Sequence, residues 1–429
     1  MKEFGQGSKP IYRPVETGVP KSVTRSAAAV IPRLDGVDLI RGLSILAVIL
    51  LHISIFAHRE NVDVGQGLPR WLHYLLFWNG GNGVSAFFVV SGFLITLISI
   101  RRFGSLAQMR AGRFYRIRFA RIAPPLLLLL GVLSAMHLAG VADFRINPQV
   151  ASLPVALLSA LTFNLNWLEA LRGWLPPCWT VLWSLSVEEM FYLAFPLACL
   201  ILWRRRPARI AFFGLLVGLI IVAPFARTAP FSNHIWQGQS YFGNMDGIAL
   251  GCLCALFTDW CLRNRRLQQT RWPLIAQITG AVLVAVIAVW PWPTELAGWQ
   301  FKRALAETGT DVTVLILGTA LFIWGSVLRG SGSAAWLEPI RWFGRCSYEV
   351  YLTHEFAVIA VLTVFRRGPA IVWISAVLGL SAVLGWIFAR FFSEPMNRRL
   401  RGGALLAGSP LPAHRGREPA VARVEVGRD

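Results

Sequence analysis

The sequence predicts an all-α, polytopic integral membrane protein: a bundle of about ten transmembrane helices plus one short helix that is re-entrant or interfacial. Hydrophobic residues make up 55% of the 429-residue chain and charged residues only 15%, whereas soluble domains carry about 25% charged residues. Several apolar runs reach about 20 residues, the length that crosses a hydrocarbon core of about 30 Å. We therefore expect most of the chain to lie in the bilayer.

Eleven apolar runs follow one another along the chain, at about 39–57, 84–100, 121–141, 151–166, 183–203, 208–226, 241–258, 273–292, 310–328, 348–365 and 370–392. Basic stretches favour the cytoplasmic side, and they lie at 1–33, 101–121, 204–209, 263–272, 329–345 and 398–401.

If all the basic stretches are cytoplasmic, an even number of spans must separate each from the next. Only the interval between 121 and 204 breaks this rule, because it contains three apolar runs. The run 151–166 is the weakest, because it is short and contains Pro154, Asn164 and Asn166. We predict that it does not span. Ten spans then remain, with both termini in the cytoplasm; the alternative is an eleventh span with one basic loop outside.

Two polar ends flank a predicted transmembrane domain at 34–402. Residues 1–33 are basic and contain proline, and no small-residue cleavage site precedes the first apolar run. This predicts a disordered cytoplasmic tail before an uncleaved span, and not a signal peptide. Residues 403–429 are rich in Gly, Pro, Ala and Arg, which predicts a second disordered cytoplasmic tail.

The formal net charge of +20 is typical of a membrane protein with Lys and Arg in its cytoplasmic loops. We expect no nucleic-acid partner, because the chain shows no basic soluble module. The six cysteines are scattered, without a C-x-x-C pair or a Cys/His cluster. The sequence therefore indicates neither a disulfide framework nor a metal site.

Arg41 and His52 lie on one face of the first predicted span. They are 11 residues apart, which is three turns plus about 20°, with a rise of roughly 16 Å. Ionisable groups inside spans usually face a cavity or a partner. A long ligand with an anionic head at Arg41 and a reactive end near His52, such as acyl-CoA, fits this spacing. A His52 satisfied within the bundle and an Arg41 that snorkels to the interface fit it equally well.

Four arginines lie just before the third predicted span: Arg113, Arg116, Arg118 and Arg121. The last two share a helix face, and planar guanidinium groups suit phosphates. This predicts a site for the head of CoA, with a positive-inside signal as the alternative. In the second span, the small residues Ser91 and Gly92 would admit a ligand arm, although helix packing also explains them.

The adjacent carboxylates Glu188 and Glu189 lie at the mouth of the span 183–203. They point 100° apart on a helix, so one is expected to orient His52 or bind a sugar hydroxyl and the other to pair with an arginine. A membrane-edge charge pair is the alternative. Late in the chain, Tyr348, Tyr351 and Glu355 share a helical stripe. The remaining candidate substrate-binding residues are Asp38, Trp183, Tyr192, Asp246, Tyr348, Tyr351 and His354.

In their order and placement, these motifs resemble the membrane-bound acyltransferase-3 family over about 35–398. The matching pieces are Arg41 and His52 with ten residues between them, Phe87-Phe88-Val-Val-Ser91-Gly92-Phe93, Arg118-x-x-Arg121-x-x-Pro124, Trp183-Ser-Leu-x-Val-Glu188-Glu189-x-Phe191-Tyr192, Ser347-Tyr348-x-x-Tyr351-Leu-x-His354, and Glu394-Pro395. Glu349 departs from the family's pattern, in which this stretch is less charged.

The resemblance implies an enzyme of a bacterial inner membrane that takes an acyl group, most often acetyl, from cytoplasmic acyl-CoA. The acceptor would be a hydroxyl of a cell-surface glycan, a lipid-linked saccharide, or a small molecule such as an antibiotic scaffold. His52 would be the essential histidine, with Arg41, Arg118 and Arg121 serving the donor, Glu188 or Glu189 supporting the site, and no metal. Some members carry an appended outer hydrolase-like domain. We expect none here, so that the acyl group is handed over within the membrane domain.

Three classes of function stay open at this point. In acyl transfer, His52 would act as general base or as a transient acyl carrier. A transporter would use buried His and Glu as a proton relay, although inverted repeats or broken helix pairs are not apparent. A structural partner in a glycan-assembly complex is the third class. The acceptor, the acyl group and the oligomeric state do not follow from the sequence.

Overall fold

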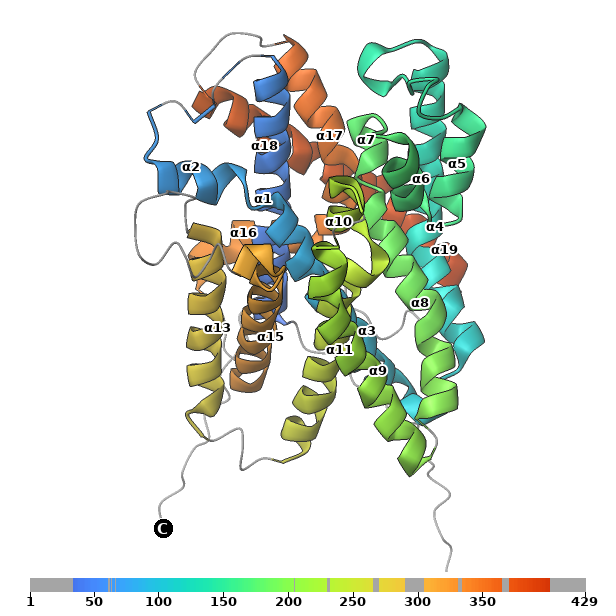
Figure 1. Cartoon of the computed structure of the whole chain (residues 1–429), viewed down its shortest axis with the longest axis vertical. Coiled ribbons are helices and arrows are strands. Elements are labelled where there is room, and N and C mark those ends of the chain that lie inside the picture. Colours follow the sequence, from blue (N-terminus) through green and yellow to red (C-terminus); the bar gives the residue numbers. More distant parts are fainter. Residues whose placement is uncertain are drawn as a thin grey trace, which may run out of the picture. The chain divides into compact units, whose positions relative to one another are not determined.

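The computed structural model describes residues 34–60, 62, 64–65, 67–203, 205–229, 232–264, 270–289, 305–330, 334–364 and 370–401. All of them belong to one compact unit of the chain, Ile31–Ala407. The described residues form helices and no β-strand (Figure 1). The predicted tails, 1–33 and 403–429, lie outside the described residues.

Nine of the described helices are long and apolar enough to cross a membrane. Their helical cores are α1 (Asp35–Arg59), α3 (Gly80–Phe103), α4 (Ala111–Leu138), α8 (Trp183–Leu202), α9 (Arg206–Arg227), α11 (Tyr241–Arg263), α13 (Trp272–Val289), α15 (Asp311–Arg329) and α18 (Ala370–Ile387). Each corresponds to one of the predicted spans. The predicted fold class, an all-α polytopic membrane bundle, is confirmed.

The tenth predicted span, 348–365, forms α17 (Ser347–Val364). It is not one of the nine because Glu349, His354 and Glu355 make it more polar than the other long helices. All three side chains are buried. Since α17 packs against α1 and α18, its polar groups face protein, where partners can satisfy them. Its role as a tenth span stays a prediction.

The weak run 151–166 becomes two short helices, α5 (Leu153–Leu161) and α6 (Leu165–Arg172). Their 9 and 8 residues measure about 14 and 12 Å, too short to cross about 30 Å of hydrocarbon. The break between them contains Phe163, whose φ of 57° is uncommon for a residue other than glycine. The Phe163 carbonyl accepts a hydrogen bond from the Tyr241 hydroxyl, which ties this break to α11.

Shorter elements connect the long helices. The α-helices are α2 (Arg70–Phe77), α7 (Pro177–Thr180), α10 (His234–Gln239), α16 (Glu338–Arg345) and α19 (Glu394–Arg401). Single 3₁₀ turns lie at Leu106–Gln108, Ala142–Phe144 and Ala335–Leu337, and a π-helical turn, Phe388–Ser393, joins α18 to α19.

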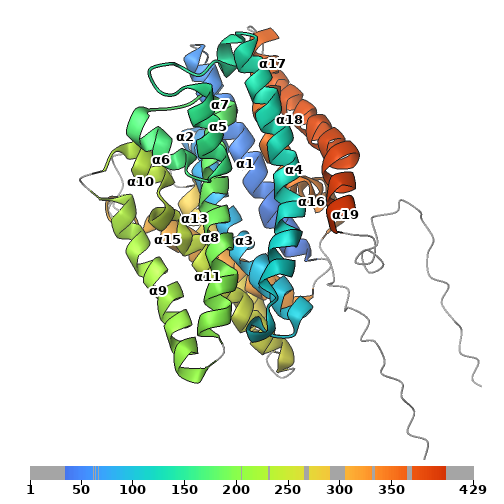
Figure 2. The same cartoon turned by 90° about the vertical axis from the view of Figure 1, so that its right-hand side faces the viewer.

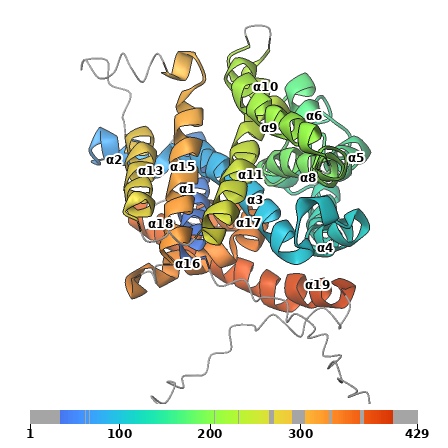
Figure 3. The ribbon, with the colours of Figure 1, turned by 90° about the horizontal axis from the view of Figure 1, so that it is seen from below.

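Of the nine candidate spans among the described residues, α3 is the most enclosed. The apolar window of α3 is 72% buried, whereas those of α9 and α13 are 17% buried, and Figure 3 shows α9 and α13 at the periphery. α1 packs against α3 and α17, and α4 packs against α8 and α19 (Figure 2). Side chains from five helices, α1, α3, α4, α8 and α17, therefore meet inside the bundle.

Glycines let α3 and α11 touch through their backbones. A Cβ on Gly92 would lie 1.9 Å from the Ile248 carbonyl oxygen, and a Cβ on Gly251 would lie 2.1 Å from the Val89 carbonyl oxygen. Such contacts are typical of small residues at membrane helix interfaces. Gly92, which the sequence suggested as a donor-binding residue, thus packs α3 against α11.

Substituting Gly92 by valine should destabilise the bundle, because two helix backbones would have to separate. We expect a loss of about 1–3 kcal/mol or more, seen as a lower melting temperature of the purified protein in detergent. Gly131→Ala is the matched control, since nothing lies within 4 Å of a Cβ built there. Equal melting temperatures for Gly92→Val and Gly131→Ala would contradict the close contact.

The carboxyl of Glu169, on α6, should make stability depend on pH. Its Oε1 accepts hydrogen bonds from the Leu175 amide at 3.1 Å and the Thr180 hydroxyl at 2.6 Å, while burial raises the pKa of Glu169 to about 7. The folded state therefore holds a proton that the unfolded chain releases near pH 4.5, so stability falls as the pH rises from about 4.5 to 7 and stays low above it.

We expect the wild-type melting temperature to drop by several degrees between pH 5.5 and pH 8 relative to the Glu169→Gln variant, which cannot ionise. Parallel pH profiles for the two proteins would show that Glu169 does not carry this proton.

Candidate active site

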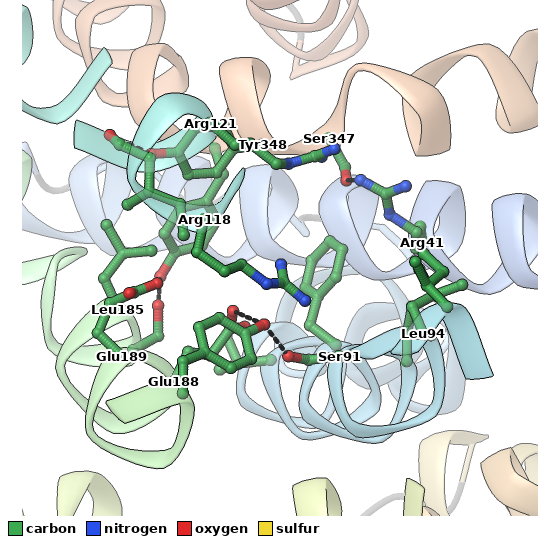
Figure 4. A pocket seen from close by; sticks show the side chains of 18 residues that line it. Arg41, Ser91, Leu94, Arg118, Arg121, Leu185, Glu188, Glu189, Ser347 and Tyr348 are labelled. Carbon is green, nitrogen blue, oxygen red and sulfur yellow. Dashed lines mark hydrogen bonds between the residues drawn. The ribbon is translucent and has the colours of Figure 1, made fainter. Parts of the chain in front are cut away.

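A cavity of about 180 Å³ lies where α1, α3, α4, α8 and α17 meet (Figure 4). It brings together many of the residues that the sequence singled out: Arg41, Ser91, Arg118, Arg121, Glu188, Glu189, Tyr192, Tyr348 and Tyr351. We call it the arginine cavity. Three guanidinium groups from two helices therefore face one space, as a donor with an anionic head would require.

A chain of hydrogen bonds lines one wall of the arginine cavity. The Tyr192 hydroxyl donates to Glu188 Oε2 at 3.0 Å and shares a second hydrogen bond with the Ser91 hydroxyl. The Arg118 guanidinium lies over the Tyr192 ring, 4.2 Å from its centroid, in a cation–π contact. This contact, together with the hydrogen bonds that fix Tyr192, holds the Arg118 guanidinium at the wall of the cavity.

Arg41 and Glu189, which also line the cavity, differ in whether their side chains have hydrogen-bond partners. Arg41 Nη2 donates to the Ser347 hydroxyl at 2.9 Å, which ties α1 to the first residue of α17. Glu189 is only 8% exposed, and its Oε1 has no hydrogen-bond partner in the described part of the chain. A buried polar atom without a partner is costly, so this oxygen is available to a ligand that donates a hydrogen bond.

His52 lies beyond the arginine cavity and does not line it. Its Nδ1 is 2.9 Å from His354 Nε2 and 3.1 Å from Glu355 Oε1. The His354 and Glu355 side chains are 0% and 1% exposed, whereas that of His52 is 21% exposed. Of this group, only His52 is open to an incoming molecule.

The hydrogen bonds of His354 determine which nitrogen of His52 is free. His354 Nδ1 lies 2.7 Å from the Tyr351 carbonyl oxygen. A carbonyl can only accept, so His354 carries its proton on Nδ1, and its Nε2 must accept. His52 Nδ1 is then the donor in the 2.9 Å contact. In its neutral form His52 therefore presents Nε2 with a free lone pair.

Tyr351 connects the arginine cavity with the histidine pair. Its hydroxyl donates to the Val181 carbonyl at 2.8 Å and is hydrogen-bonded to the Ser184 hydroxyl at 2.8 Å. Its side chain lines the cavity, while its own carbonyl holds the His354 proton. The arginine cavity and His52 are thus adjacent along α17, with Tyr351 between them.

The carboxylates that the sequence singled out lie in two different places. Glu188 and Glu189 line the arginine cavity, and the carboxylate beside His52 is Glu355. The reason is that α1 packs on α17, so α17 supplies the side chains next to His52. The helical stripe of Tyr348, Tyr351 and Glu355 was the available sequence signal for this arrangement.

Other predicted residues lie elsewhere. Asp246 pairs with Arg227 at 2.9 Å, and Arg227 also donates to the Thr313 hydroxyl at 2.8 Å. This buried network joins α9, α11 and α15, so Asp246 stabilises the bundle away from the arginine cavity. Trp183 packs edge-on against Phe88. Among the described residues, Asp38, Gly92, Arg113, Arg116 and Trp183 do not line the cavity.

The cluster of His52, His354 and Glu355 has side chains that suit a metal ion, with ligand atoms within 4.8 Å of one another. Zinc with nitrogen ligands at about 2.0–2.1 Å would hold tetrahedral ligand atoms roughly 3.3 Å apart. The 2.9 Å separation of the two imidazole nitrogens is shorter and matches a hydrogen bond. The geometry therefore fits a shared proton better than a shared ion.

The all-helical membrane bundle, with its arginine-lined cavity next to a paired histidine, agrees with the membrane acyl-transfer enzyme that the resemblance of the sequence motifs implies. The chain belongs to the acyltransferase-3 family, whose model, described as an acyltransferase domain, matches residues 34–390.

Two curated relatives show the same similarity. The chain is 24% identical over 394 residues to the O-acetyltransferase OatA of Staphylococcus aureus (strain COL), covering 85% of this chain and 57% of the relative. It is 24% identical over 396 residues to the peptidoglycan O-acetyltransferase OatA of Listeria monocytogenes, covering 88% and 57%. The chain thus spans a little over half the length of these relatives. No solved structure matches it.

Proposed function

We propose that this chain is a membrane O-acyltransferase that moves an acyl group, most often acetyl, from cytoplasmic acyl-CoA to a hydroxyl of a cell-surface glycan or lipid-linked saccharide. The observation that carries the proposal is the free Nε2 of His52, oriented through His354 by the Tyr351 carbonyl. A histidine whose reactive nitrogen is set by a second, buried partner is a hallmark of general-base and nucleophilic sites.

The donor would bind in the arginine cavity. Arg41, Arg118 and Arg121 line it together, and their guanidinium groups suit phosphate oxygens. The helical rise from Arg41 to His52 is roughly 16 Å, a distance that the pantetheine arm of CoA can cover. The thioester would then approach His52 past Tyr351, which borders both places.

In the direct route, His52 Nε2 takes the proton of the acceptor hydroxyl. The alkoxide oxygen bonds to the thioester carbonyl carbon, the carbon–sulfur bond breaks, and the CoA thiolate takes the proton back from His52. In the alternative route, Nε2 first bonds to the thioester carbonyl carbon, and the carbon–sulfur bond breaks to release the CoA thiolate. The acceptor oxygen then bonds to the acyl carbon, the bond from that carbon to Nε2 breaks, and the hydroxyl proton ends on the CoA thiolate. Both routes place positive charge on His52, and the Glu355 carboxylate 3.1 Å away would stabilise it.

The choice of acetyl and of a saccharide acceptor is supported by the names of the two relatives, one of which specifies peptidoglycan. A small-molecule scaffold remains the alternative acceptor. A transporter would use the same buried histidines and carboxylates as a proton relay, but it would not release free CoA. Release of the CoA thiol therefore separates the enzyme from the carrier.

The test is the rate of free-thiol release from acetyl-CoA by purified protein in lipid nanodiscs, with glycan acceptors present. General-base catalysis contributes about 10²–10⁴-fold, so His52→Ala should slow release by at least about 100-fold. His58→Ala is the matched control, because His58 lies on the same helix and is exposed; it should behave as wild type. If His52→Ala and wild type release CoA at the same rate, the proposed role of His52 is wrong.

A further inference from the structure

A second cavity, of about 180 Å³, lies between α3, α4 and α19. Its lining includes four arginines: Arg102 at the end of α3, Arg118 and Arg121 on α4, and Arg401 at the end of α19. The other lining residues are Ser99 and five apolar side chains, with no acidic residue among them. We call it the four-arginine cavity.

The four-arginine cavity adjoins the arginine cavity. Arg118 and Arg121 line both, so their guanidinium groups form the boundary between the two spaces. The charges nearest to this boundary differ on its two sides. Glu188 and Glu189 line the first cavity, whereas the second has four positive charges and no counter-charge among its lining residues.

Four guanidinium groups around one small space repel one another, and this repulsion is strong where water is scarce. The charge of Arg401 interacts unfavourably with those of Arg102, Arg118 and Arg121. Its Nε has no hydrogen-bond partner in the described part of the chain. An anion with several charges would remove the repulsion and supply the missing acceptors.

The structure holds Arg401 in this place. The π-helical turn before α19 ends at Ser393, whose hydroxyl donates to Glu349 Oε1 at 2.7 Å. This contact accounts for Glu349, the acidic residue that departs from the family's pattern. α19 then packs against α4 (Figure 3). Its other arginines are used differently: Arg398 pairs with Glu394 at 3.2 Å, and Arg399 is exposed.

We propose that the four-arginine cavity binds a ligand with two or more phosphate groups, and that Arg401 and Arg102 extend the donor site to the phosphate-rich head of acyl-CoA. This inference rests on the proposed function, because that function supplies a nucleotide donor. In this arrangement the phosphates lie outside the boundary formed by Arg118 and Arg121, and the acyl-bearing arm passes into the arginine cavity. An anionic lipid headgroup carries the same chemistry and is the other source of phosphate.

The experiment measures binding of CoA to the purified full-length protein in nanodiscs, for wild type, Arg401→Gln, Arg102→Gln and the control Arg399→Gln. A hydrogen bond to a charged group contributes enough to change affinity by about tenfold or more. We therefore expect the first two variants to bind CoA at least about tenfold more weakly, with Arg399→Gln unchanged. Arg401→Lys, which keeps the charge, should recover part of the affinity. Ligand-free melting temperatures of the variants that are no lower than that of the wild type would exclude misfolding.

Two further arms separate the possible outcomes. The phosphatidylglycerol that remains bound after purification is measured by native mass spectrometry, and inorganic pyrophosphate is titrated as a phosphate probe. Loss of bound lipid in Arg401→Gln with unchanged CoA affinity would support the phosphate site and assign it to lipid. Unchanged binding of CoA, lipid and pyrophosphate in both variants would overturn the inference. Wild-type protein that binds pyrophosphate but not CoA would instead count against the proposed function.

Discussion

The hydrogen bond between His52 on α1 and His354 on α17 is the interaction on which the account of this protein depends. The Tyr351 carbonyl accepts the proton on His354 Nδ1, and His354 Nε2 accepts the proton on His52 Nδ1. Neutral His52 is therefore left with an unprotonated Nε2. A backbone carbonyl does not titrate and can only accept a hydrogen bond. The hydrogen bonds that orient His52 therefore begin at a group whose role does not change with pH. The Glu355 carboxyl lies beside the other ring nitrogen, with its Oε1 3.1 Å from His52 Nδ1.

The same pair of helices is joined near its other end by the hydrogen bond from Arg41 to Ser347. α1 and α17 are therefore held together at two positions, the arginine that faces the cavity and the histidine beyond it. In a membrane, unsatisfied polar groups are costly, so these contacts stabilise the bundle as well as the site. The Arg227–Asp246 ion pair likewise joins α9 to α11, away from the arginine cavity.

The sequence was sufficient to predict the fold class, because long apolar runs form membrane-spanning helices. It also indicated that Arg41, Arg118 and Arg121 serve one site, because all three belong to the motifs that resemble the family. It could not predict the partners of His52. Those depend on which face of α17 packs on α1, and helical periodicity does not give the rotation of one helix against another. For the same reason the sequence left open whether Gly92 contacts a ligand or a helix, and in the structure it lies against α11. The sequence also did not show that Arg401 lies near Arg118.

The most direct test is the protonation state of His52 itself. The chain has seven histidines, and ¹⁵N-histidine solid-state NMR of the protein in liposomes can assign His52 by comparison with the His52→Gln variant. We expect a neutral His52 ring with the proton on Nδ1 and a bare Nε2, together with a His354 ring that is also protonated on Nδ1. A His52 ring protonated on Nε2 with a bare Nδ1 would contradict it, because the reactive nitrogen would then face His354 and no acceptor or acyl group could reach it.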